Sequence, residues 1–193
     1  MSPEVWYVSY GSNMCRDRLG AYLLGGQPVG ARRAYAGART PTMPVADAAV
    51  DLPGRLYFAG ESPIWTGGVA FYDHDATGSW TAARAYRVTA EQFADIAAQE
   101  MDRLPRAGDP IERLVIDGLE NGRHEAGPGH YETLIEVGRR DGLPMLTFTA
   151  PHGFDAVPHT RPAEAYAAML VRGLGESRGW DTARAEAYVM DRC

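Results

Sequence analysis

Two places in this sequence combine residue types that could carry out chemistry, and the first is the tetrapeptide Tyr10-Gly11-Ser12-Asn13. Its glycine allows the backbone to turn tightly and to approach a ligand closely. Amide N–H groups at the start of a following helix would form a site for a carboxylate or a developing oxyanion. A plain strand-to-helix turn, with Ser12 or Asn13 as the helix cap, explains the same residues. The tetrapeptide therefore indicates either an anion-binding turn or a simple cap.

The second place is Glu100, near the end of a helix predicted over residues 89–101. Phe93, Ile96 and Ala97 share one face of that helix, and Glu100 falls on the same apolar face. Burial raises the pKa of a carboxyl group, as a general acid or base near neutral pH requires. The alternative is that the helix end turns this carboxylate out to water.

The elements that must position these residues follow from the pattern of apolar and turn-forming residues. A strand at Val5–Tyr10 leads through the glycine turn into a helix at Met14–Leu24. Residues 25–53 read mostly as loop, with one strand near Gly30–Tyr35. The helix over 89–101 begins with a T-x-x-Q capping box made by Thr89 and Gln92. Further strands are expected at 55–59, 68–73, 82–88, 112–117, 130–137 and 143–149, and further helices at 163–174 and 182–190.

This order of elements favours an α+β fold with a small, mainly antiparallel β-barrel or curved sheet and flanking helices. The length of 193 residues fits a single domain over residues 1–193.

Composition excludes several classes of function. The net charge of −6 argues against nucleic acid as the main partner. No apolar run approaches the roughly 20 residues of a membrane span, and the start of the chain lacks the pattern of a signal peptide, so a cytoplasmic location is expected. Cys15 and Cys193 lack metal-ligand spacing, and so do His124, His130 and the other histidines, so no metal is expected.

Several runs together resemble the γ-glutamylcyclotransferase-like family. They are Val5–Met14, which contains the Y-G-S-N tetrapeptide, then Trp65–Ala70, and Ala85–Val88 leading into the helix that ends in Glu100. The resemblance implies a small β-barrel with flanking helices. It also implies that Glu100 is the catalytic acid/base, that Tyr131 lines the substrate pocket, and that the 162–173 helix with Tyr166 is the closing segment. Three positions depart from the family pattern: Ala97, Met101 and Phe148.

The implied reaction converts a γ-glutamyl amine or peptide into 5-oxoproline and a free amine, without a metal or organic cofactor. Glu100 would move the proton, the amides of Gly11, Ser12 and Asn13 would hold a carboxylate or oxyanion, and Tyr10 would wall the pocket. The partner is then a small-molecule γ-glutamyl substrate. The alternatives are a different γ-glutamyl amine as substrate, a non-catalytic relative that binds a small acidic ligand, and an interaction protein without pocket chemistry.

Other residues carry weaker signals. Arg16 and Arg18 follow the turn, and they could assist with a carboxylate or could be solvated. Strand aromatics such as Tyr7 and Tyr86 are expected in the core. Histidines are expected in surface loops.

Overall fold

The computed structural model describes residues 3–28, 34–62 and 66–193 of the chain. Six strands form one sheet in the order β2-β5-β1-β8-β7-β6, and β3 and β4 form a separate pair. Neighbouring strands are antiparallel except for β1 and β8, which run parallel. The strands are β1 (Glu4–Ser9), β2 (Asp47–Pro53), β3 (Arg55–Ala59), β4 (Val69–Asp73), β5 (Trp80–Thr89), β6 (Arg123–Glu125), β7 (Thr133–Arg140) and β8 (Leu143–Thr149). The α+β class is confirmed, but the sheet is open, with β2 and β6 at its edges, so it is a curved sheet rather than a closed barrel.

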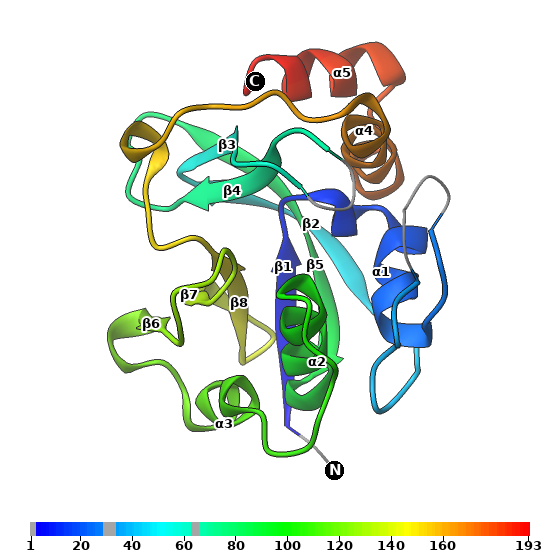
Figure 1. The fold of residues 1–193 in the computed structure, drawn as a ribbon, viewed down its shortest axis with the longest axis vertical. Helices are drawn as coiled ribbons and strands as arrows, with labels where there is room; N and C mark the ends of the chain where they lie inside the picture. Colours follow the sequence, from blue (N-terminus) through cyan, green and yellow to red (C-terminus); the bar gives the residue numbers. More distant parts are fainter. Residues whose placement is uncertain (1–2, 29–33, 63–65) are drawn as a thin grey trace.

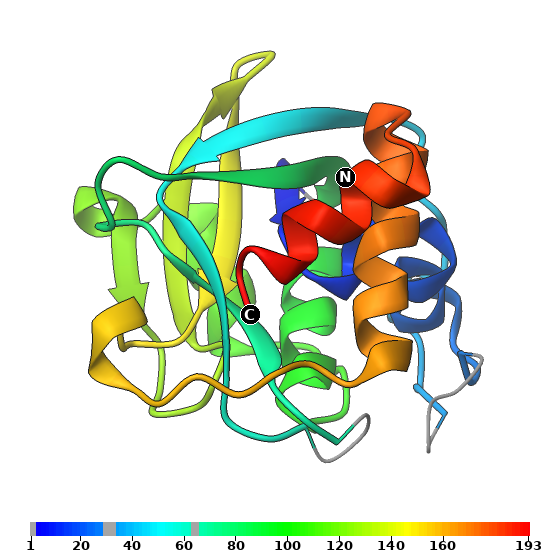
Figure 2. The ribbon, with the colours of Figure 1, turned by 90° about the horizontal axis from the view of Figure 1, so that it is seen from above.

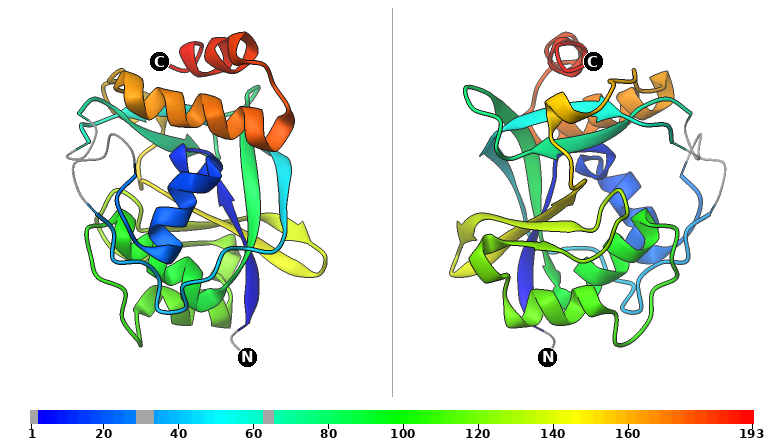
Figure 3. Two further views of the ribbon diagram at one scale, coloured as in Figure 1. Left: turned by 90° about the vertical axis from the view of Figure 1, so that its right-hand side faces the viewer. Right: turned by 60° about the vertical axis from the view of Figure 1, so that its left-hand side comes forward.

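Helices cover both faces of the sheet (Figures 1 and 3). The helices are α1 (Arg16–Leu24), α2 (Ala90–Glu100), α3 (Pro110–Asp117), α4 (Glu164–Arg178) and α5 (Thr182–Met190), with short 3-10 turns η1 (Ser12–Met14), η2 (Glu120–Gly122) and η3 (Phe154–Ala156). One core packs α1, α2 and α3 against the sheet, and the other packs α4, α5 and the β3–β4 pair against it. Figure 2 shows α4 and α5 lying together over the sheet.

Strand β1 lies between these two cores. Trp6 and Val8 pack into the core on the α4–α5 side, whereas Val5 and Tyr7 pack into the core on the α1–α3 side. Successive side chains of a strand point to opposite faces, so a strand that is covered on both sides reads as a continuous apolar run. This explains why the sequence before the Y-G-S-N tetrapeptide is apolar at nearly every position.

Helix α2 begins as the sequence predicted. The Thr89 hydroxyl accepts a hydrogen bond from Gln92 N (3.1 Å), and Thr89 N donates to the Gln92 side-chain oxygen (3.2 Å). These reciprocal bonds satisfy two N–H groups that a helix start leaves without partners. The helix then runs to Glu100, which places that residue at its C-terminal end.

Three predictions about secondary structure are wrong. The strand expected at 112–117 is helix α3, because Asp109 caps it by accepting from Ile111 N (3.0 Å) and Pro110 occupies a first-turn position. The loop expected over 25–53 contains β2, whose weak strand propensity is overridden by its pairing with β5. Tyr131, expected at the start of a strand, lies in the turn before β7.

Two predictions fall partly on residues that the structure does not describe. The strand near 30–35 lies mostly outside the described residues, and of it Tyr35 forms an isolated bridge with Gly26. Trp65 of the Trp65–Ala70 run also lies outside them. Within the described ranges, no helix is long and apolar enough to cross a membrane. A cytoplasmic location stays a prediction.

Candidate active site

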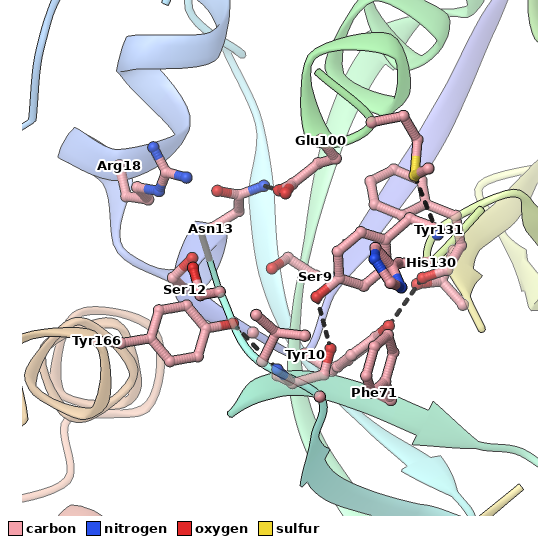
Figure 4. Close-up of a pocket in the computed structure, with 18 of the residues that line it drawn as sticks. Ser9, Tyr10, Ser12, Asn13, Arg18, Phe71, Glu100, His130, Tyr131 and Tyr166 are labelled. Atoms are coloured by element: carbon pink, nitrogen blue, oxygen red, sulfur yellow. Dashed lines mark hydrogen bonds between the residues drawn. The ribbon is translucent and has the colours of Figure 1, made fainter. Parts of the chain in front are cut away.

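A cavity of about 340 Å³ opens where η1, α1, the end of α2, β4 and α4 approach one another. Its volume lies at the small end of the ~300–1,000 Å³ range of ligand pockets. Figure 4 shows side chains from all of these elements converging on it. Every site residue predicted from the sequence lines this cavity: Tyr10, Gly11, Ser12, Asn13, Glu100 and Tyr131.

The Y-G-S-N tetrapeptide forms the turn at one side of the cavity. Met14 N donates to Gly11 O (3.0 Å) and Cys15 N donates to Ser12 O (3.0 Å). The first N–H group bonded within the turn is that of Met14. The amides of Gly11, Ser12 and Asn13 come before it, so the turn itself offers them no acceptor. Neither Ser12 nor Asn13 caps a helix with its side chain. The alternative interpretation of the tetrapeptide as a simple helix cap is therefore wrong.

Gly11 is required neither by an unusual backbone angle nor by a steric clash. Its φ of −111° is open to any residue. A Cβ atom at this position would lie 3.4 Å from both the Ala70 Cβ and the Tyr166 hydroxyl oxygen. The absent side chain leaves the backbone at the cavity surface, where its amide is accessible to a ligand.

Two residues of strand β5 donate hydrogen bonds to the carbonyl groups of the turn. The Tyr86 hydroxyl donates to the carbonyl oxygens of Asn13 (3.0 Å) and Met14 (2.9 Å), and Arg84 Nη1 also donates to Met14 O (2.9 Å). These bonds fix the carbonyl groups of Asn13 and Met14 in place. Tyr86 is a core aromatic, as expected, and its hydroxyl positions the site.

Asn13 connects the turn to the carboxylate of α2. Its Nδ2 donates one hydrogen bond to Glu100 Oε1 (2.9 Å) and another to the Tyr7 hydroxyl (3.0 Å) (Figure 4). Both N–H groups of the amide are then used. Its Oδ1 is buried and has no hydrogen-bond partner among the residues that the structure describes. This oxygen is an acceptor that a bound ligand could satisfy.

Glu100 is a carboxyl group whose ionised form is disfavoured. Burial raises its pKa, and the charge of Arg18 with hydrogen bonds from Tyr22 and Asn13 lowers it without cancelling the rise. Its position at the C-terminal end of α2 acts in the same direction as burial, because the helix dipole there is negative. Of the two alternatives for Glu100, this burial agrees with a side chain that turns inward, not with one that turns out to water.

Arg18 reaches the same cavity from α1. It is 2% exposed, and its Nη2 donates to the hydroxyls of Tyr22 (2.7 Å) and Tyr35 (2.8 Å). Its guanidinium lies 4.5 Å from the centre of each ring. Arg16, in contrast, pairs with Asp47 near the surface. The sequence signal that separates them is Tyr22, four residues after Arg18 on the same helix face.

Three tyrosines complete the walls. The Tyr10 hydroxyl donates to Phe148 O (2.8 Å), and the Tyr131 hydroxyl donates to Ala70 O (2.8 Å). Each hydroxyl thus ties a residue outside the strands to a strand carbonyl, Tyr10 to β8 and Tyr131 to β4. Tyr166 of α4 accepts from Ala70 N (3.3 Å), and burial with the nearby Glu100 raises its pKa to about 12. Tyr166 is therefore a neutral hydroxyl at physiological pH.

The sequence reading missed Tyr7, Ser9 and His130 as cavity residues. Tyr7 was expected in the core, where its ring does pack on Phe148 at 5.4 Å, while its hydroxyl faces Asn13. Ser9 carried a usable signal, because it interrupts the apolar face of β1 that Val5 and Tyr7 begin. His130 gave no signal.

Among the residues that the structure describes, one cluster of potential metal ligands lies outside this cavity. Asp73, His74 and Asp75 bring one ligand atom each within 4.8 Å of one another. Arg123 Nη1 lies 3.3 Å from His74 Nε2, and its charge disfavours a cation there.

Comparisons with known proteins bear mainly on the fold. No family model matches the chain. A crystal structure of an uncharacterised protein from Homo sapiens matches it with a TM-score of 0.58 at 15% identity, over 98% of this chain and 88% of that one. The structure of a γ-glutamyl cyclotransferase matches with a TM-score of 0.51 at 14% identity, over the same shares of the two chains. The chain therefore has the γ-glutamylcyclotransferase-like fold, as the resemblance in its sequence predicted.

One curated protein is similar in sequence. It is histone deacetylase 5 from Arabidopsis thaliana, 33% identical over 199 aligned residues, which cover 96% of this chain and 30% of that protein. Most of that protein has no counterpart in this chain.

Proposed function

We propose that this protein is a γ-glutamylcyclotransferase-type enzyme, which converts a γ-glutamyl amine or peptide into 5-oxoproline and the free amine. The observation that carries the proposal is Glu100, a carboxyl group of raised pKa hydrogen-bonded to Asn13 within the cavity that the turn lines. The likeness of the fold to a γ-glutamyl cyclotransferase supports it.

The reaction needs one group that accepts and then donates a proton. In the substrate, the α-amino nitrogen attacks the γ-carbonyl carbon and closes a five-membered ring. The α-ammonium must first lose a proton, which Glu100 accepts. When the C–N bond to the amine breaks, Glu100 returns that proton to the leaving nitrogen. The ring nitrogen also gives up its second extra proton, so that the lactam is neutral and the amine leaves as an ammonium ion. The attacking group is already tethered, so holding the substrate folded supplies much of the acceleration.

The turn offers groups for the rest of the substrate. The amides of Gly11, Ser12 and Asn13 would bind the glutamyl carboxylate or the oxyanion that forms at the γ-carbonyl. Asn13 Oδ1, which lacks a partner within the described chain, would accept from the substrate ammonium. That bond would hold the nitrogen next to Glu100, since the same amide contacts Oε1 of the carboxylate.

The test is 5-oxoproline release from a panel of γ-glutamyl amines and peptides, with wild type and Glu100→Gln compared. Loss of a general acid/base costs about 10²–10⁴-fold in rate. Glu91→Gln is the matched control, because Glu91 lies in the first turn of the same helix and contacts Thr40 outside the cavity. We expect Glu91→Gln to keep wild-type activity.

The opposite outcome points to a non-catalytic protein. If wild type releases no 5-oxoproline but binds glutamate or a γ-glutamyl compound in calorimetry, the cavity is a binding site for a small acidic ligand. Activity that persists in a folded Glu100→Gln protein would remove Glu100 from the mechanism.

A further inference from the structure

Helix α1, which follows the turn, is capped by a residue from another helix. Its N-cap residue is Cys15, whose side chain makes no capping hydrogen bond in the described part of the chain. The first helical amide, Arg16 N, donates to Glu176 Oε2 of α4 (2.8 Å), and Figure 3 shows α4 lying across this end of α1. A carboxylate is favoured there because the N-terminal end of a helix carries a partial positive charge.

The same carboxylate oxygen forms an ion pair with Arg84 of β5. Arg84 Nη1 donates to Glu176 Oε2 (3.0 Å) and to Met14 O (2.9 Å), and its Nε donates to Asp47 Oδ1 of β2 (2.9 Å). The Arg84 side chain is 6% exposed and that of Glu176 is 25% exposed, so solvent screens this pair less than a pair on the surface. Together the two residues bond the last carbonyl of η1 and the first amide of α1.

Glu176 and Arg84 contact the turn from outside the cavity. Neither is among the described residues that line it, so a substrate in the cavity would not touch them. Glu176 lies three residues after Gly173, on the same face of α4. Gly173 packs against Met14 and Cys15, where a Cβ atom would come within 2.6 Å of their atoms. Helix α4 therefore contacts the turn both by close packing and by charge.

We propose that Glu176 and Arg84 are positioning residues of the site, whose ion pair fixes the turn in the place that the reaction requires relative to Glu100. This rests on the proposed cyclotransferase function. Loss of the pair leaves the turn held by packing and by the hydroxyl of Tyr86. The turn's amides and the Asn13 side chain then depart from the geometry in which they meet the substrate and Glu100, while the rest of the fold remains.

The first variant is Glu176→Gln, which keeps the size of the side chain and removes its charge. We expect kcat/KM for 5-oxoproline release to fall about tenfold to a hundredfold, because small displacements of positioning groups cost that much. Hydrogen exchange of the Met14 and Cys15 amides, which are bonded within the turn, reports on the turn directly. It should become about tenfold faster, because the turn opens locally more often.

Asp109→Asn is the matched control. The Asp109 carboxylate also accepts from an amide at the start of a helix, Ile111 N of α3 (3.0 Å), and also pairs with an arginine, Arg103 (3.0 Å). Asp109 is not among the described residues that line the cavity. This variant should lower the free energy of unfolding in urea but leave kcat/KM and the exchange of the turn unchanged. The difference separates positioning of the turn from general stabilisation.

Two variants of Arg84 test the pair from its other side. Arg84→Lys keeps the positive charge and can still donate hydrogen bonds, whereas Arg84→Met keeps only apolar length. Arg84→Lys should therefore retain more of the wild-type kcat/KM than Arg84→Met. Equal activity of these two variants would overturn the proposal, and this comparison also decides it if Glu176→Gln does not fold.

The failure of this inference is distinguishable from the failure of the proposed function. Wild-type kcat/KM in a folded Glu176→Gln protein, or an equal loss in Asp109→Asn, would overturn the positioning role and leave the cyclotransferase intact. If wild type releases no 5-oxoproline, the cyclotransferase fails, and hydrogen exchange decides the role of the pair. Faster exchange of the turn in Glu176→Gln but not in Asp109→Asn supports it, and unchanged exchange overturns it.

Discussion

Asn13 is the residue through which the two halves of the site act on each other. Its backbone belongs to the turn that offers amides, and its side chain donates to Glu100 and to Tyr7. A hydrogen bond to an ionised group contributes about 1.5–3 kcal/mol, roughly twice the value for a neutral pair. The bond to Glu100 therefore both orients the carboxylate and limits the rise in its pKa.

Asn13→Ala should move the pH dependence of the enzyme. Removal of the hydrogen bond raises the pKa of Glu100 further, so the acid limb of kcat/KM, where the base becomes protonated, moves to higher pH. The activity at neutral pH should fall by about tenfold to a hundredfold, which corresponds to the bond's ~1.5–3 kcal/mol. Asn13→Asp should move the limb in the same direction, because it adds a like charge. A limb that stays in place in both variants would contradict this role.

Glu100→Gln should stabilise the protein, and increasingly so as the pH rises. The pKa of Glu100 is higher in the folded state than in the unfolded chain, so folding favours the protonated form. Wild type therefore loses stability as the pH rises from the unfolded pKa, about 4.3, through the folded pKa, while glutamine does not titrate. Urea unfolding of both proteins between pH 4 and pH 8 measures the difference. A stability difference that does not depend on pH would show that Glu100 has an ordinary pKa.

At the scale of elements, helix α4 holds the turn in place by close packing. Gly173 lies against the backbone between Met14 and Cys15, where a Cβ atom would come within 2.6 Å of their atoms. Tyr166 of the same helix accepts a hydrogen bond from β4. Helix α4 thus links the turn to the opposite wall of the cavity, and α2 brings Glu100 to meet them.

Gly173→Ala should damage both stability and activity. The added methyl cannot fit without a shift of α4 or of the turn, and overpacking costs about 1–3 kcal/mol. Displacement of the turn by even 1 Å would misplace the amides, so kcat/KM should fall about a hundredfold. The measurements are urea unfolding and 5-oxoproline release.

Gly175→Ala is the matched control on the same helix. Its Cβ would come no closer than 3.4 Å to Trp180 O, which is ordinary contact. Alanine is favoured over glycine in a helix by about 1 kcal/mol, so this variant should be neutral or more stable. If both variants behaved alike, the contact with the turn would not be the cause.

At the scale of the whole molecule, the sheet separates two cores that share strand β1. The core on the α4–α5 side contains Leu170 and the core on the α1–α3 side contains Leu23. Since β1 contributes side chains to both, loss of one core removes the support of the other. The chain should therefore unfold as one unit, as a single domain would; the single domain over residues 1–193 stays a prediction.

Cooperative unfolding can be measured with one substitution in each core. Leu170→Ala and Leu23→Ala should each lower the free energy of unfolding by about 2–5 kcal/mol. Tryptophan fluorescence reports largely on the α4–α5 side, where Trp6 and Trp180 pack, and far-UV circular dichroism reports on all helices. Both probes should shift together in both variants. A variant that separates the two transitions would indicate two independently folding units.

Local signals in the sequence were sufficient for the main elements. The strand before Tyr10, the capping box of α2 and the helix at 182–190 each depend on residues close in sequence. The resemblance to a known family placed Glu100 and the turn in one pocket. All six predicted site residues do line one cavity, although their roles stay predictions until the assays are made.

Only the tertiary structure decided the contacts between distant segments. Strand β2 forms because it pairs with β5. The sheet is open because its edge strands β2 and β6 do not pair with each other. Residue types alone reveal neither pairing. The bond from Asn13 to Glu100 joins residues 87 positions apart, and the same burial that brings them together raises the pKa of the carboxyl. Residue types and spacing fix local structure through the backbone, whereas burial and charge depend on which segments meet, and that is settled only when the whole chain packs.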